Sequence, residues 1–192
     1  MISPLKFDSV IDISCGDGEF LSMLYKMNPS LRLIASDISK VSINKTRSKL
    51  LGMYPDIDCT FITTDARDID LWIPSLLQSS SRTGKELICM WFLLHEIAEF
   101  STTKIIDFLK TIHSYSNEAY ILIGEILRIE PSILSKNKEE SIMPEILFTH
   151  DISNQSVLTY KQFKEILKEI PYKIINKKNL DLIKGKDDKK EI

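Results

Sequence analysis

The sequence has no long hydrophobic run, few cysteines and almost no net charge. The longest uninterrupted apolar run is the eight residues from Leu87 to Leu94, whereas a membrane-spanning helix needs roughly 20 residues. Residues 1–6 lack the basic start and long apolar stretch of a secretory signal. We therefore expect neither a membrane-spanning segment nor a leader peptide in this sequence.

Cysteine is scarce, and the opposite charges balance. Cys15, Cys59 and Cys89 are an odd number of cysteines in apolar or strand-like contexts, which indicates reduced thiols in a cytoplasmic protein and disfavours a disulfide scaffold. The 25 Lys and Arg residues face 27 Asp and Glu residues, for a net charge of −2. This balance gives no electrostatic reason to expect a nucleic-acid or membrane partner.

The sequence does contain a regular alternation of short apolar runs with amphipathic helical patterns. The predicted strands cover residues 7–13, 31–35, 57–63, 86–92, 120–126 and 172–175. Strands that alternate with helices indicate right-handed crossovers and a mostly parallel sheet covered on both faces. We therefore predict an α/β fold with a single domain over residues 1–183. Residues 127–150 are predicted to be an insertion near the active site, and residues 184–192 a charged flexible tail.

The turn after the first predicted strand is the most informative segment. Asp12, Ser14, Gly16 and Gly18 occupy alternate positions between that strand and the next helix. Glycines there allow a sharp turn and a close approach by a ligand, and ligands of open parallel sheets bind at the carboxyl ends of the strands. A dinucleotide fingerprint would need a third glycine at the position of Leu21, and a Gly-Lys-Ser/Thr phosphate loop is absent.

The segment instead resembles motif I of the class I S-adenosylmethionine-dependent methyltransferases, D/E-x-G-x-G-x-G, with Ser14 in the first glycine position. This resemblance implies a Rossmann-like, doubly wound, mostly parallel seven-stranded sheet with helices on both faces. It also implies S-adenosylmethionine as the cofactor. A non-catalytic domain that keeps the fold for scaffolding stays open, because Ser14 departs from the motif.

The resemblance extends to the ends of the next predicted strands. It implies that Asp37 accepts hydrogen bonds from the ribose hydroxyls, for which a carboxylate is suited, and that Asp65 accepts from the adenine amino group. Trp91 stands where the backbone usually contacts the methionine end of the cofactor. The full set of implied cofactor residues is Asp12, Ser14, Gly16, Gly18, Asp37, Ile38, Asp65, Ala66 and Trp91.

A second set of polar residues groups around two histidines. His95 and Glu96 follow the fourth predicted strand, and His150, Asp151 and Gln155 lie between the predicted insertion and the last predicted helix. Nitrogen and oxygen ligands of this kind suit iron(II) or manganese. Together they resemble the metal-dependent C-methyltransferase domains of modular polyketide synthases.

This narrower resemblance implies metal-assisted methylation of a malonyl-type unit on an acyl carrier protein. The metal would be held by His150, Asp151 and Gln155, and would stabilise an enolate as a Lewis acid, with His95 or Glu96 as the base. The alternative is a metal-independent O- or N-methyltransferase of a small molecule with His95 as the base. Few residues precede motif I, so we expect an open acceptor side that suits a carrier-bound substrate or a domain of a larger synthase.

Overall fold

The computed structural model describes residues 7–69, 73, 85–99, 101–128, 148–150, 152–153, 155 and 157–173. Its centre is a sheet of parallel strands in the order β3-β2-β1-β4-β5. The strands are β1 (Ser9–Asp12), β2 (Arg32–Asp37), β3 (Cys59–Thr63), β4 (Glu86–Trp91) and β5 (Tyr120–Gly124). Because the order reverses beside β1, the carboxyl ends of β1 and β4 form the crevice where such sheets bind ligands.

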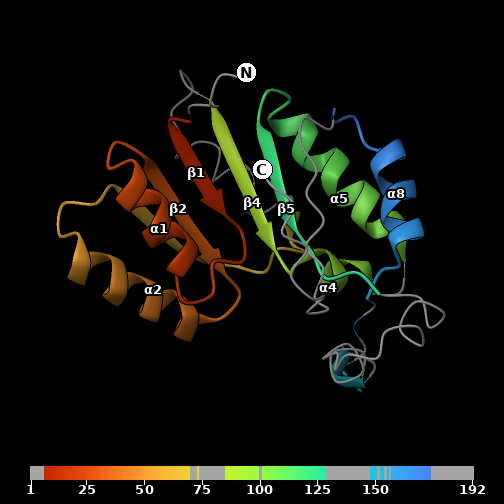
Figure 1. The fold of residues 1–192 in the computed structure, drawn as a ribbon, viewed down its shortest axis with the longest axis horizontal. Helices are drawn as coiled ribbons and strands as arrows, with labels where there is room; N and C mark the ends of the chain where they lie inside the picture. Colours follow the sequence, from red (N-terminus) through yellow and green to blue (C-terminus); the bar gives the residue numbers. More distant parts are fainter. Residues whose placement is uncertain are drawn as a thin grey trace, which may run out of the picture.

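Helices cover both faces of this sheet, as predicted (Figure 1). Alternate residues of the strands point to opposite faces. Val10 and Leu33 pack toward α1 (Glu19–Met27) and α2 (Lys40–Met53). Ile11 and Ile34 belong to the core on the other face, which is covered by three helices. Those helices are α4 (Leu94–Ala98), α5 (Thr102–Tyr115) and α8 (Tyr160–Glu169).

Local sequence explains where several helices begin. The Ser39 side chain accepts a hydrogen bond from the Ser42 backbone N–H and caps α2. Thr159 and Gln162 form the predicted capping box at the start of α8. The short helix α4 was not predicted, because a single turn is too short to produce a hydrophobic period.

The described residues form five strands of the sheet. The seven strands that the family resemblance implies stay a prediction, because part of the chain lies outside the described ranges. Tyr172 and Lys173, at the start of the sixth predicted strand, are not in a strand, and residues 174–175 lie outside the described ranges. β5 ends at Gly124 rather than at residue 126, because the neighbouring chain turns away at Phe92, where φ is 53°.

The predicted insertion and tail can be followed only in part. Arg128 at the start of the insertion makes a parallel bridge to Thr159, and residues 148–150 at its end are helical. The intervening residues 129–147 and the tail at 184–192 lie outside the described residues. The single-domain boundary at residue 183 therefore stays a prediction.

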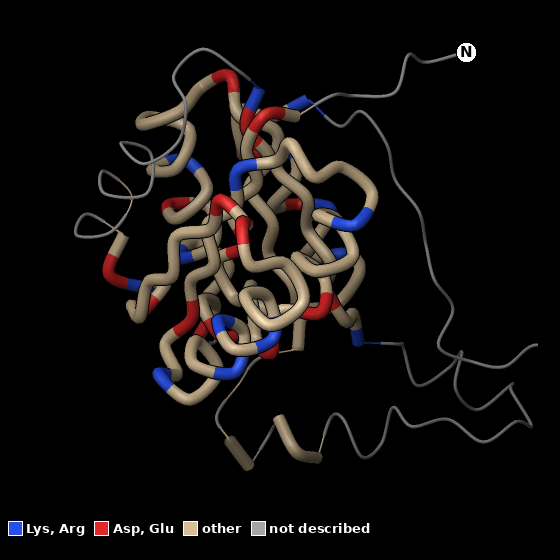
Figure 2. The backbone as a smooth tube through the Cα atoms, turned by 90° about the vertical axis from the view of Figure 1, so that its left-hand side faces the viewer, with Lys and Arg blue, Asp and Glu red and all other residues tan. Residues whose placement is uncertain are grey.

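Charges of both signs are distributed over the surface. Figure 2 shows Lys and Arg interspersed with Asp and Glu along the described chain. The longest helices, α2 and α5, have 14 residues each. Within the described ranges, no helix is long and apolar enough to cross a membrane.

Gly124→Ala should destabilise the fold, because β5 passes directly beneath an indole ring. A Cβ at Gly124 would lie 2.1 Å from Trp91 Cε3, and the ring cannot simply move because it packs edge-on against Phe20 with centroids 5.0 Å apart. We expect a loss of about 1–3 kcal/mol in the free energy of unfolding, measured by urea titration.

Gly52→Ala is the matched control for this substitution. A Cβ at Gly52 would meet nothing within 4 Å, and alanine is preferred to glycine in a helix by about 1 kcal/mol. The control should therefore stabilise the protein slightly. Equal stabilities of the two variants would contradict the packing of Trp91 over Gly124.

Candidate functional site

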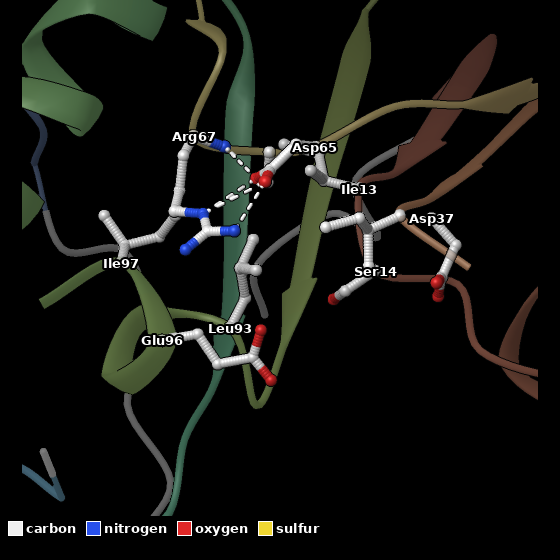
Figure 3. Close-up of a pocket in the computed structure, with 10 residues that line it drawn as sticks. Ile13, Ser14, Asp37, Asp65, Arg67, Leu93, Glu96 and Ile97 are labelled. Carbon is white, nitrogen blue, oxygen red and sulfur yellow. Dashed lines mark hydrogen bonds and ion pairs between the residues drawn. The ribbon is translucent and has the colours of Figure 1, made fainter. Parts of the chain in front are cut away.

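A hollow opens at the carboxyl ends of four neighbouring strands (Figure 3). Its cavity volume is about 130 Å³, below the roughly 300–1,000 Å³ of most ligand pockets, so the described residues form a small cleft. Each wall comes from residues at or just after the end of a strand. The lining residues are Ile13, Ser14, Asp37, Ile38, Asp65, Ala66, Arg67, Leu93, Glu96 and Ile97.

The glycine turn beside this cleft requires its two glycines. Gly16 and Gly18 have φ values of 55° and 77°, in the left-handed region that favours glycine. The Thr46 hydroxyl of α2 donates to the Gly16 carbonyl over 2.9 Å. A Cβ at Gly18 would lie 2.5 Å from Thr46 Cγ2, so α2 packs directly against the turn and fixes its position.

The hydrogen bonds of Ser14 explain why a serine stands at the first glycine position of the family motif. Its hydroxyl donates to the Trp91 carbonyl over 3.0 Å and accepts from the Trp91 N–H over 3.3 Å. The side chain therefore joins the end of β1 to the end of β4, which a glycine could not do. Ser14 also forms part of the lining of the cleft.

Asp37, for which the family resemblance implies ribose binding, lies in the lining of the cleft beside the glycine turn. Its Oδ2 accepts from the Gly16 N–H over 3.0 Å, and its Oδ1 accepts from the Ser39 N–H over 2.8 Å. A carboxylate has about four acceptor positions, so both oxygens keep capacity for hydroxyl donors in the cleft. Ile38, which also lines the cleft, is 58% exposed. Its side chain offers an apolar surface of the kind on which a nucleobase packs.

Asp65 is already engaged, which the sequence did not indicate. Its carboxylate accepts from the Arg67 backbone N–H and from the Arg67 guanidinium, with Nη2 2.6 Å from Oδ2. The dashed lines in Figure 3 follow this pairing. The guanidinium lowers the pKa of Asp65. Ala66 is buried next to it and also lines the cleft.

Asp12 is buried behind the glycine turn. It is 1% exposed, and within the described part of the chain neither carboxylate oxygen has a hydrogen-bond partner in good geometry. Burial raises the pKa of Asp12 to about 7, and the charge of Asp37 adds to this effect, while the Ser14 amide opposes it. A buried carboxyl group of this kind is costly to ionise unless a cation is bound nearby.

His95 forms a buried pair that the sequence analysis missed. Its Nδ1 lies 2.9 Å from Glu125 Oε1, and the two side chains are only 6% and 2% exposed. Burial opposes the protonated imidazole, but the hydrogen bond with Glu125 and the charge of Glu96 outweigh it, so the pKa of His95 is raised. Glu125 directly follows β5, and an acidic residue at the carboxyl end of a buried strand is the signal that could have found it.

Glu96 and His150 have different surroundings. Glu96 is exposed and lines the cleft (Figure 3), whereas the His150 ring packs edge-on against His95 with centroids 4.8 Å apart. The structure thus brings the two predicted histidine groups together. Gln155 accepts a hydrogen bond from the Ser153 hydroxyl, and Asp151 lies outside the described residues.

The expected metal ligands do not form a recognisable metal centre in the described segments. Among the residues there, no group of three or more His, Cys, Asp or Glu side chains could hold an ion.

The cysteines are free, and burial raises the pKa of Cys15 and of Cys59 to about 12. These thiols are therefore protonated at neutral pH, in agreement with a structural role.

Comparison with known proteins places the fold. No protein-family model and no curated protein sequence matches the chain, but many solved structures do. The plantazolicin methyltransferase BpumL, solved with SAH, is 28% identical over 85% of this chain and 55% of that one, with a TM-score of 0.53. The plantazolicin methyltransferase BamL, also solved with SAH, is 23% identical, with coverages of 85% and 53% and a TM-score of 0.55.

A third solved structure, LaPhzM, has a TM-score of 0.58 at 19% identity, over 88% of this chain and 45% of that one. The chain thus spans about half the length of these solved proteins. The parallel sheet, the glycine turn and the cleft at the strand ends agree with this similarity. The chain has the Rossmann-like fold of the S-adenosylmethionine-dependent methyltransferases.

Proposed function

We propose that this protein is an S-adenosylmethionine-dependent methyltransferase that acts on an O–H or N–H acceptor with His95 as the general base. The observation that carries the proposal is the buried His95–Glu125 pair beside a cleft that Asp37 and the glycine turn border. The BpumL similarity supports the same class of cofactor, because that enzyme was solved with SAH.

The residues of the cleft fit the proposed cofactor. Asp37 has free acceptor positions for two neighbouring hydroxyls, and its Oδ2 accepts from the Gly16 N–H, which joins the glycine turn to a residue of the cleft lining. When bound, S-adenosylmethionine would supply a methyl group on a sulfonium, which passes in line to an aligned nucleophile while S-adenosylhomocysteine leaves with the electrons of the carbon–sulfur bond.

His95 is suited to remove a proton from the acceptor. When Nδ1 carries the proton and donates it to Glu125, Nε2 keeps a lone pair and is the basic atom. Proton transfer to Nε2 charges the imidazole, and the Glu125 carboxylate stabilises the resulting imidazolium. Glu125 is itself held by the His95 backbone N–H and the Ile126 backbone N–H, so the pair is positioned before the acceptor arrives.

Metal-assisted C-methylation of a carrier-bound malonyl-type unit is the second candidate. The contact between the His95 and His150 rings favours it, because it puts two imidazoles side by side. We favour the metal-independent reaction, since the Gln155 carboxamide oxygen, an expected metal ligand, already accepts a hydrogen bond from the Ser153 hydroxyl. In either reaction, we propose a small molecule or a carrier-bound group as the methyl acceptor. A cytoplasmic location is also part of this proposal.

Asp37→Ala should weaken binding of S-adenosylhomocysteine (SAH), measured by calorimetry. Loss of the acceptors for two buried hydroxyls costs about 1–3 kcal/mol, or roughly 5- to 150-fold in Kd. Asp58→Ala is the control, because Asp58 is an exposed carboxylate that pairs with Arg32 away from the cleft. Unchanged affinity in Asp37→Ala would remove this residue from the site. Absence of SAH binding by the wild-type protein would favour a non-catalytic domain.

Chelation should leave turnover unchanged if the metal-independent proposal is right. We expect full activity after dialysis against a chelator, and we expect Gln155→Ala to retain activity, because its carboxamide would have no ligand role. Elemental analysis of the dialysed protein is the control for complete removal of metal. Loss of activity on chelation that iron(II) or manganese restores would instead establish the metal-assisted reaction.

A further inference from the structure

Arg67 forms ion pairs with two residues from different elements around the cleft, one after β3 and one after α4. Its guanidinium contacts Asp65 at the end of β3, with Nη2 2.6 Å from Oδ2, and Glu99 after α4, with Nη1 3.2 Å from Oε1. Arg67 itself lines the cleft (Figure 3). The helix α4 carries His95, so one side chain links the predicted adenine end of the cleft to the helix of the proposed base.

Both oxygens of the Asp65 carboxylate are engaged by Arg67 in this arrangement. Oδ1 accepts from the Arg67 backbone N–H over 2.9 Å and from Nε over 3.0 Å. Oδ2 accepts from Nε over 3.1 Å and from Nη2. Three N–H groups of Arg67 thus occupy most of the roughly four acceptor positions of the carboxylate, so an amino group that binds Asp65 competes with the guanidinium.

Glu99, the second ion-pair partner of Arg67, has a strained backbone conformation. Glu99 has a φ of 38°, which a residue with a side chain adopts only when its surroundings hold it there. Its carboxylate is bound by Arg67 and by Lys104 at the start of α5. A guanidinium that leaves Asp65 remains attached to Glu99, and the change in its position reaches the carboxyl end of α4.

We propose that Arg67 is a positioning residue that competes with the cofactor for Asp65 and couples occupation of the adenine end of the cleft to α4 and His95. The inference rests on the proposed function, because it needs a cofactor with an amino group on its base. The competing ion pair is half exposed, with Arg67 at 52% and Asp65 at 23%, so it is weak enough for a ligand to break.

Calorimetry with SAH tests the competition. Arg67→Gln should bind SAH about two- to fivefold more tightly than the wild-type protein, which is the range of an exposed ion pair. Arg32→Gln is the matched control, because Arg32 forms a comparable exposed pair with Asp58 at the opposite end of β2, and it should bind as the wild-type protein does. S-inosylhomocysteine has a carbonyl oxygen in place of the amino group, so Arg67→Gln should not bind it more tightly.

Nuclear magnetic resonance of the histidine rings tests the coupling. The chain has three histidines, and His113 on α5, which packs against Tyr172, serves as the internal reference. SAH should move the His95 signal in the wild-type protein. In Glu99→Gln, SAH should still bind, but it should move the His95 signal less, because the link from Arg67 to α4 is weakened.

The outcomes separate this inference from the proposed function. Failure of the wild-type protein to bind SAH overturns both. Binding of SAH by the wild-type protein, with equal or weaker binding by Arg67→Gln, overturns only the competition at Asp65. An equal movement of the His95 signal in Glu99→Gln and in the wild-type protein overturns the coupling to α4.

Discussion

His95→Gln should lower kcat by about 10²- to 10⁴-fold, the usual contribution of a positioned general base. Gln cannot accept the acceptor's proton at neutral pH, so the loss falls on the chemical step. Binding of SAH should change little, because His95 does not line the cleft formed by Ile13, Asp37 and their neighbours. Single-turnover rates with a methyl acceptor, together with SAH calorimetry, separate the two effects.

The pH profile gives this prediction a second readout. A base must be neutral to act, so activity should rise with pH through the raised pKa of His95, above the usual 6.5. Glu125→Gln removes the hydrogen-bonded carboxylate that raises this pKa. The rise in activity should therefore move to lower pH while kcat falls, because the imidazolium is less stabilised.

Two further variants serve as controls for the base. His113→Gln replaces a histidine of α5 that packs against Tyr172 and should leave kcat unchanged. Glu96→Gln removes the carboxylate that lines the cleft (Figure 3). If Glu96→Gln loses as much activity as we expect for His95→Gln, and His95→Gln itself stays active, then Glu96 rather than His95 is the base.

Asp12→Asn should be more stable than the wild-type protein at pH 8 and should lose the part of the pH dependence of folding that Asp12 contributes. The pKa of Asp12 rises from 3.8 to about 7 on burial, so the folded protein holds a proton that the unfolded chain releases in this range. The stabilising contribution is complete below pH 3.8 and is lost as the pH rises through about 7. The difference corresponds to about 4 kcal/mol.

Urea unfolding of both proteins between pH 5 and about 8 measures this effect, within the range where the linkage is steep. Asp56→Asn is the control, because Asp56 is exposed in the turn before β3; its pH dependence should match that of the wild-type protein. A wild-type stability that increases from pH 5 to about 8 would contradict a buried, protonated Asp12, because linkage then has the opposite sign.

The fold was predictable because its signals are local. Continuous apolar runs such as Leu87–Met90 indicate strands buried on both faces, and capping residues such as Thr159 mark helix starts. The glycine turn was predictable for the same reason, since the positive φ at Gly16 and Gly18 is a property of the backbone. The number of strands was not predictable from these signals. It came from the family resemblance, and the described residues contain five.

The sequence alone determined the parallel α/β sheet, the turn at its switch point and the position of Asp37 beside that turn. Only the tertiary structure decided which side chains pair across the cleft. His95 and Glu125 are 30 positions apart, and Ser14 and Trp91 are 77 apart. Periodicity and propensity describe neighbours along the chain, whereas these contacts depend on which loops the sheet order brings together at its carboxyl edge.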